Sequence, residues 1–105
     1  MRKIETEMNE AIRFCLDWNK DNTRVVTTED TSKVYLHGNL IAEVSRTAVT
    51  LFDGGWQSNT TKSRLNAIIA EFVNPFVRVF QKDFTWYVRD EDKQNHQFQN
   101  GYCFS

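Results

Sequence analysis

The sequence contains little cysteine, proline or glycine: two, one and four residues respectively in a chain of 105. Cys15 and Cys103 lie far apart, and neither belongs to a Cys-x-x-Cys pair, so they do not describe a disulfide framework. We interpret both as free thiols; a bridge between the two ends of the chain is the alternative. The spacings of the two cysteines with His37 and His96 do not describe a zinc site, and the glycines form no nucleotide-binding motif. No metal or cofactor is therefore expected.

The sequence also has no long apolar run and no large excess of positive or negative charge. No run approaches the roughly 18–20 residues that a membrane-spanning helix needs, and residues 1–7 lack the apolar region of a signal peptide. We therefore expect an intracellular protein with no membrane partner. The net charge is −1, from 13 basic and 14 acidic residues, so the whole chain exerts no pull toward nucleic acid. Any anion-binding surface must be a local patch.

Aromatic side chains are abundant, with eight Phe, three Trp and three Tyr. This apolar area, in a chain of this length, predicts one globular domain over residues 1–105 with a single core.

Two segments have the periodicity of amphipathic helices. In the first, Phe14 and Trp18 lie off the apolar stripe, so they either widen the buried face or form an exposed aromatic edge. The second begins near Ser58, Asn59 or Thr60, all competent N-caps, and ends at Asn74-Pro75. The apolar faces consist of Ile4, Met8, Ala11, Ile12, Cys15 and Leu16 in the first helix, and of Leu65, Ile68, Ile69, Phe72 and Val73 in the second.

The rest of the chain has the character of short strands. Gly38-Asn39 predicts a two-residue hairpin turn, and Asn100-Gly101 is a favoured type I′ pair. The runs 34–36 and 40–44 alternate poorly, which indicates a strand covered on both faces or a bulge. Phe84 and Trp86 share a strand face that we expect in the core. The expected strands are Thr23–Thr28, Lys33–His37, Leu40–Ser45, Ala48–Phe52, Phe76–Phe80, Phe84–Arg89, His96–Gln99 and Tyr102–Phe104.

Short connections between these strands predict an α+β fold. It consists of a mostly antiparallel sheet of about six to eight short strands with two amphipathic helices packed on one face. Exposed strands at a sheet edge could pair with a second copy, which leaves a homodimer open. No nucleophile and base stand in an activating motif, because nothing around either cysteine pairs it with a histidine. We therefore expect a protein that is not an enzyme.

The segment from Gly54 to Asn66 is the most informative for function. Lys62 and Arg64 place two cations at the start of a helix, which already carries unpaired N–H groups and partial positive charge. Such a placement is favourable if an anion binds there, held by N–H groups, cations and the hydroxyls of Thr60 and Thr61. Trp56, just before the helix, could stack on a base or fill a partner's pocket. The alternative is that Trp56 packs beneath its loop and that the cations are ordinary surface charges.

Two sequence blocks resemble a known group of proteins. They are Leu-His-Gly-Asn-Leu-Ile-Ala at residues 36–42 and Gly-Gly-Trp-Gln-Ser-Asn-Thr-Thr-Lys-Ser-Arg-Leu-Asn at residues 54–66. Together they resemble short uncharacterised proteins encoded by tailed bacteriophages. The resemblance implies a phage accessory protein in the cytoplasm of the bacterial host, and it brings no activity, cofactor or catalytic residue.

These observations lead to a non-enzymatic phage accessory binding protein. The first hypothesis is that it contacts nucleic acid through a basic and aromatic patch at the start of the second helix, made by Trp56, Thr60, Thr61, Lys62 and Arg64. The alternative is a protein–protein effector that inhibits or redirects a host enzyme, which the abundance of aromatic side chains suits. A component of the virion is a further reading that the sequence leaves open.

Overall fold

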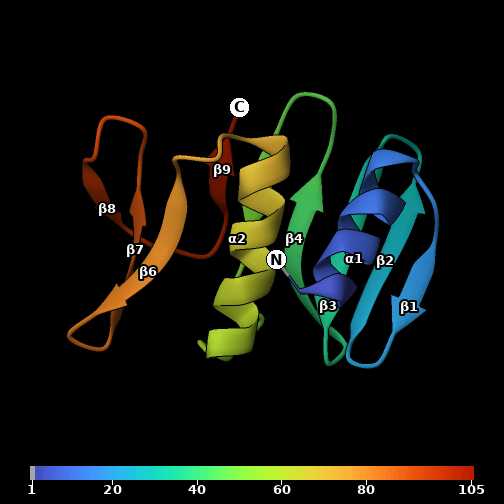
Figure 1. The fold of residues 1–105 in the computed structure, drawn as a ribbon, viewed down its shortest axis with the longest axis horizontal. Helices are drawn as coiled ribbons and strands as arrows, with labels where there is room; N and C mark the ends of the chain where they lie inside the picture. Colours follow the sequence, from blue (N-terminus) through green and yellow to red (C-terminus); the bar gives the residue numbers. More distant parts are fainter. Residues whose placement is uncertain (1) are drawn as a thin grey trace.

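The computed structural model describes residues 2–105, and these form two helices and nine strands (Figure 1). The helices are α1 (Lys3–Arg13) and α2 (Asn59–Phe72). The strands are β1 (Trp18–Lys20), β2 (Thr23–Thr28), β3 (Thr31–Leu36), β4 (Asn39–Val44), β5 (Val49–Leu51), β6 (Arg78–Lys82), β7 (Thr85–Arg89), β8 (Asn95–Gln97) and β9 (Tyr102–Phe104).

The strands form two antiparallel sheets, which confirms the predicted α+β class. Six strands make one sheet in the order β1-β2-β3-β4-β5-β9, and β6, β7 and β8 make a second, three-stranded sheet. Helix α1 packs on β1 and β2, and α2 packs on β4 and β5 while its other side contacts β6 (Figure 1). Both helices therefore cover one face of the large sheet, and α2 also joins that sheet to the smaller one.

Alternation along the strands decides which side chains enter the core. In β3, Ser32, Val34 and Leu36 are buried toward the helices, whereas Lys33 and Tyr35 lie on the opposite face. The smaller sheet contributes further buried side chains, including Val79, Trp86 and Val88. The side chain of Asn66 in α2 fixes this sheet to the helix, because it donates to the Val79 carbonyl at 2.9 Å and accepts from the Val79 N–H at 2.7 Å.

Strand β4 contains the irregularity that its sequence pattern predicts. Val34 pairs with Ala42 and Tyr35 pairs with Leu40, so Ile41 is an extra residue on β4. Ile41 and Ala42 are both buried, which explains why the apolar residues of this strand are not separated by polar ones. The predicted bulge is confirmed.

The first helix is shorter than its sequence pattern predicts. It ends at Arg13 because Cys15 adopts a left-handed conformation with φ of 56°. The Cys15 N–H donates to the carbonyl of Ile12 at 3.3 Å and the Leu16 N–H donates to that of Ala11 at 2.9 Å, the bonding pattern of a Schellman C-cap. Cys15 and Leu16, expected on the buried face, are instead exposed. The second helix ends before Asn74-Pro75 as predicted.

Two of the predicted turns differ from the turns in the structure, one in its position and one in its type. The β3–β4 hairpin turns at His37-Gly38 and not at Gly38-Asn39, since φ is 52° and 80° at the first two and Asn39 pairs with Leu36. A type I′ turn requires positive φ at both central residues, and His tolerates that conformation better than most side chains. At Asn100-Gly101 only Gly101 has positive φ, so the turn is not type I′, and it connects the two sheets.

The expectation that Phe84 lies in the core is wrong. The β6–β7 hairpin turns at Asp83-Phe84, with Lys82 paired to Thr85, and φ is 50° and 65° at the two turn residues. Phe84 is consequently 93% exposed at the tip of the hairpin. Trp86 is buried as expected and packs edge-on against Phe98.

Candidate functional site

One end of the molecule gathers the segments that the sequence singled out. The start of α2, the loop that precedes it, the β1–β2 turn and the β3–β4 turn all lie at the lower end in Figure 1. This end consists of loops and turns, and binding residues are found more often on loops than in the core.

The α2 N-terminus is capped by Ser58, one of the three predicted caps. The Ser58 hydroxyl accepts from the Thr61 N–H at 3.1 Å. Thr61 itself is buried, and its hydroxyl donates to the Trp56 carbonyl at 3.2 Å. Thr61 therefore holds the loop onto the helix and does not face solvent. Thr60 and Lys62 are partly exposed, and neither side chain has a hydrogen-bond or ion-pair partner within residues 2–105.

Arg64 is placed differently from the sequence hypothesis, because it lies inside the protein. Its Nη1 forms an ion pair with Glu5 Oε2 at 2.8 Å, and both side chains are only 4% exposed. Its Nε donates to the Thr23 hydroxyl at 3.0 Å, and its Nη2 donates to Asn22 Oδ1 at 3.3 Å. The Ser63 hydroxyl also donates to Glu5. The guanidinium thus joins α2 to α1 and β2 and is not part of a surface patch.

The two cations at the start of α2 consequently do not converge. Lys62 and Arg64 are two residues apart on a helix and point to different sides of it. Arg64 is neutralised by Glu5, which leaves Lys62 as the accessible cation in the first turns of α2.

Trp56 is exposed, and the loop that carries it is held by hydrogen bonds on both sides of this residue. The indole is 75% exposed. The carboxylate of Asp53 accepts from the Gly55 N–H at 2.7 Å and from Gln57 Nε2 at 3.2 Å, while the Asp53 N–H donates to Asn100 Oδ1 at 2.8 Å. These bonds, with the Thr61 contact, fix the loop on both sides of the tryptophan.

Gly54 is required at its position in this loop for two reasons. Its φ is 71°, a conformation that L side chains rarely adopt. A Cβ at Gly54 would also lie 3.1 Å from Ile41 Cγ2 and 3.3 Å from Asn39 Cβ. The loop therefore approaches β4 as closely as a residue without a side chain permits.

A cleft of about 310 Å³ adjoins the indole. Its floor is apolar, formed by Leu36 and Ile41, and polar groups of His37, Asn39 and Asp53 stand around it. We call it the Trp56 cleft; its lining also includes Gly54, Trp56, Ser58 and Thr61. The sequence hypothesis missed the contribution of β3 and β4. The signal was available in the first resemblance block, since Leu36 to Ile41 all belong to it.

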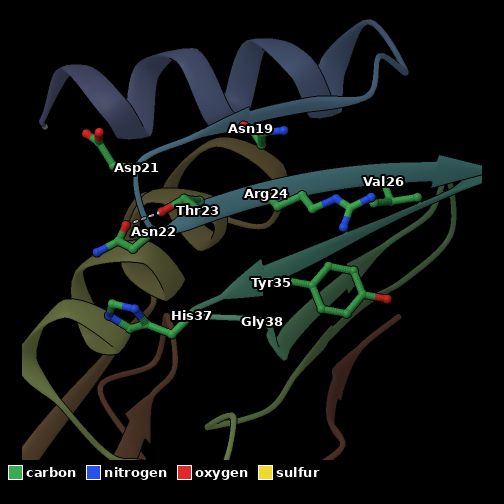
Figure 2. Close-up of a pocket in the computed structure, with 9 residues that line it drawn as sticks. All are labelled: Asn19, Asp21, Asn22, Thr23, Arg24, Val26, Tyr35, His37 and Gly38. Atoms are coloured by element: carbon green, nitrogen blue, oxygen red, sulfur yellow. Dashed lines mark hydrogen bonds between the residues drawn. The ribbon is translucent and has the colours of Figure 1, made fainter.

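A second hollow lies on the face of the large sheet that neither helix covers. It measures about 670 Å³ and is lined by Asn19, Asp21, Asn22, Thr23, Arg24, Val26, Tyr35, His37 and Gly38 (Figure 2). Arg24 and Tyr35 occupy directly paired positions of β2 and β3 and extend over the sheet in the same direction (Figure 2). We call this the open-face hollow. It meets the Trp56 cleft at His37, which lines both.

The remaining His, Cys, Asp and Glu side chains form no metal-binding cluster in the described part of the chain. No three His, Cys, Asp or Glu side chains of residues 2–105 come close enough together to hold a metal ion. Cys15 and Cys103 are free thiols, as expected, and the side chains of both are exposed. His96 Nε2 lies 2.7 Å from Asp90 Oδ2. This contact, with the N–H groups of Gln94 and Asp92, holds the pKa of the exposed Asp90 carboxyl below its ordinary value.

These features define a small α+β fold whose distinctive surface group is an exposed tryptophan on a hydrogen-bonded loop. The chain belongs to the Kyanoviridae Gp96 protein family, whose model matches residues 1–105. It is therefore a phage protein, and the resemblance to short tailed-phage proteins is confirmed. No curated protein and no solved structure matches it. Among residues 2–105, neither helix has the length and apolarity to cross a membrane.

Proposed function

We propose that this phage protein is a non-enzymatic binding module that docks a partner protein through Trp56 and the Trp56 cleft. The observation that carries the proposal is a 75% exposed indole on a loop fixed by hydrogen bonds. Burying a large apolar side chain is worth roughly 1.5–3 kcal/mol, so the fold forgoes that stabilisation here. Because hydrogen bonds already hold the loop, little backbone ordering is needed when the tryptophan binds, and an exposed tryptophan is a common interface hot spot.

The charges around the loop favour a protein over nucleic acid at this position. With Arg64 bound to Glu5, Lys62 is the accessible cation at the start of α2, and the loop before the helix also carries the negative carboxylate of Asp53. Nucleic-acid affinity comes largely from several phosphate contacts made by Lys and Arg. A cleft with an apolar floor and a polar rim instead suits one side chain of a protein partner, inserted beside the indole.

Capture from host lysate with the immobilised chain tests this function. The variants are Trp56→Ser and, as a matched control, Phe76→Ser, because Phe76 is 77% exposed and lies in the α2–β6 connection. We expect a stoichiometric host protein to be retained by the wild type and by Phe76→Ser, to survive nuclease treatment, and to bind Trp56→Ser roughly thirty-fold more weakly. Equal retention by both variants would contradict the proposal.

Nucleic acid remains the second candidate, on a different surface. Arg24 and Tyr35 stand side by side on the uncovered sheet face, and an aromatic ring with an adjacent guanidinium is the unit that holds single strands elsewhere. If this candidate is correct, single-stranded DNA or RNA binds at low salt, weakens as salt rises, and binds Arg24→Ala and Tyr35→Ala less tightly. Absence of binding at low salt would exclude it, and Trp56→Ser should have no effect on it.

A further inference from the structure

A separate apolar groove lies at the other end of the molecule from the Trp56 cleft. It is formed where α1 ends and β1 begins, the upper end in Figure 1, whereas the loop before α2 lies at the lower end. The groove measures about 200 Å³ and is lined by Glu7, Glu10, Ala11, Phe14, Leu16, Asp17 and Trp18. We call it the α1 groove. It contains the aromatic edge that the sequence pattern left open as an alternative for Phe14 and Trp18.

The apolar side chains of this groove are exposed at a sharp change of chain direction. Phe14 is 62% exposed and Leu16 is 58% exposed, whereas Trp18 packs partly against the core. The turn between α1 and β1 places Cys15 in the left-handed conformation, where glycine is the usual residue. Phe14 and Leu16 therefore remain exposed to solvent on either side of Cys15, whose backbone conformation is strained.

The rim of the groove is negatively charged. Glu7, Glu10 and Asp17 contribute three carboxylates, and the lining contains no Lys or Arg. Lys20 forms an ion pair with Glu7 at 3.1 Å, and Asp17 accepts from the Thr27 N–H at 2.8 Å. The Glu10 side chain has no hydrogen-bond or ion-pair partner within the part of the chain that the structure describes. One exposed carboxylate is thus free beside the two exposed apolar side chains.

We propose that the α1 groove docks a short cationic and apolar segment of a partner protein. The leucine-like side chain of such a segment would pack on Phe14 and Leu16. A neighbouring lysine or arginine would lay its aliphatic stem along the aromatic rings and place its charge at Glu10. The carboxylates repel nucleic acid and anionic lipid surfaces, so charge complementarity selects a basic protein segment. This contact is independent of the proposed docking through Trp56.

Three peptides of about 18 residues each, long enough to form a helix in isolation, test the docking. The first has lysines and leucines on one face, the second replaces lysine by glutamate, and the third replaces leucine by serine. Fluorescence anisotropy of the labelled peptides with the full chain measures binding. We expect the first peptide to bind and the other two to bind roughly ten-fold or more weakly. Failure of the first peptide to bind, or equal binding of all three, overturns the proposal.

Matched variants locate the contact. Phe14→Ser and Glu10→Lys should each weaken the first peptide roughly ten-fold, because one removes apolar area and the other reverses the free charge. Phe76→Ser and Asp92→Lys make the same chemical changes at exposed positions elsewhere and should leave binding unchanged. An equal effect of Asp92→Lys would mean that binding follows net charge alone. Sedimentation of the wild type showing a dimer that Phe14→Ser dissociates would assign the groove to a second copy. Either result overturns the proposal.

Discussion

Replacement of Arg64 by Met should destabilise the protein strongly, although the sequence alone suggests that Arg64 is a surface cation. Arg64 and Glu5 are each 4% exposed, and the guanidinium makes three separate bonds, to Glu5, Thr23 and Asn22. Methionine fills much of the volume of the arginine stem but leaves the Glu5 carboxylate buried without its cation. The cost is therefore chiefly the uncompensated charge and only secondarily lost packing.

The expected magnitude follows from the burial. Removing one partner of a buried ion pair costs about 3–5 kcal/mol, and a domain of this size is stable by roughly 5–15 kcal/mol. Glu5 keeps bonds from the Ser63 hydroxyl and the Arg2 N–H, which places Arg64→Met toward the lower end of that range. At about 4–8 °C for each kcal/mol, the melting temperature should fall by roughly 12–24 °C.

Urea unfolding followed by circular dichroism provides the measurement, with Arg13→Met as the matched control. Arg13 forms its ion pair with Glu71, but these side chains are 54% and 26% exposed, so its loss should cost less than about 1 kcal/mol. The double variant Glu5→Leu with Arg64→Met removes both charges and should recover most of the stability that Arg64→Met loses. A loss for Arg64→Met no larger than that of Arg13→Met would refute the reasoning, as would a double variant less stable than the single one.

Three further predictions about particular features of the fold can be tested by the same unfolding assay. Phe84→Gly should stabilise the protein by about 0.5–1 kcal/mol, because it relieves positive φ at a residue that is 93% exposed; a loss would contradict this. Gly54→Ala should cost about 1–3 kcal/mol and exceed the cost of Gly55→Ala, where φ is also positive but no atom lies within 4 Å of the added Cβ. Asp90→Asn should reduce the loss of stability on acidification. The His96 contact lowers the pKa of Asp90 in the folded protein, so Asp90 stabilises the fold when the pH is above 3.8, the ordinary pKa of this group. That stabilisation is lost as the pH falls through the folded-state pKa. An unchanged acid profile would exclude that contribution.

The parts of the fold that the sequence predicts correctly depend on local patterns. Both helices show apolar spacing close to 3.6 residues, and Ser58 and Pro75 mark the limits of α2. The bulge in β4 is indicated by Leu40, Ile41 and Ala42, three consecutive apolar residues where a half-buried strand would alternate. In each case a pattern within a few residues indicates the local structure, and a single sequence contains that information.

The errors arise where a residue other than glycine adopts positive φ. Cys15 ends α1, His37 shifts the β3–β4 turn by one residue, and Asp83-Phe84 forms the β6–β7 turn. Sequence patterns locate such turns through Gly and Asn. Without those residues, alternation alone assigns Phe84 to the face of Trp86, whereas in the structure Trp86 is buried against Phe98 and Phe84 lies in the exposed turn.

The hypothesis for the start of α2 illustrates why a charge pattern alone does not define a binding site. A cation near a helix N-terminus requires compensation, and a bound anion or a buried carboxylate can provide it equally well. Glu5 provides it here from 59 residues away in the chain, and it lies in the first turn of α1, where the dipole of that helix also favours a negative charge. One carboxylate thus stabilises α1 and neutralises Arg64, so the positive charge needs no ligand. The exposed indole of Trp56 has no such explanation within the fold, because nothing in the described chain covers it. For that reason the proposed function depends on the tryptophan and not on the charges beside it.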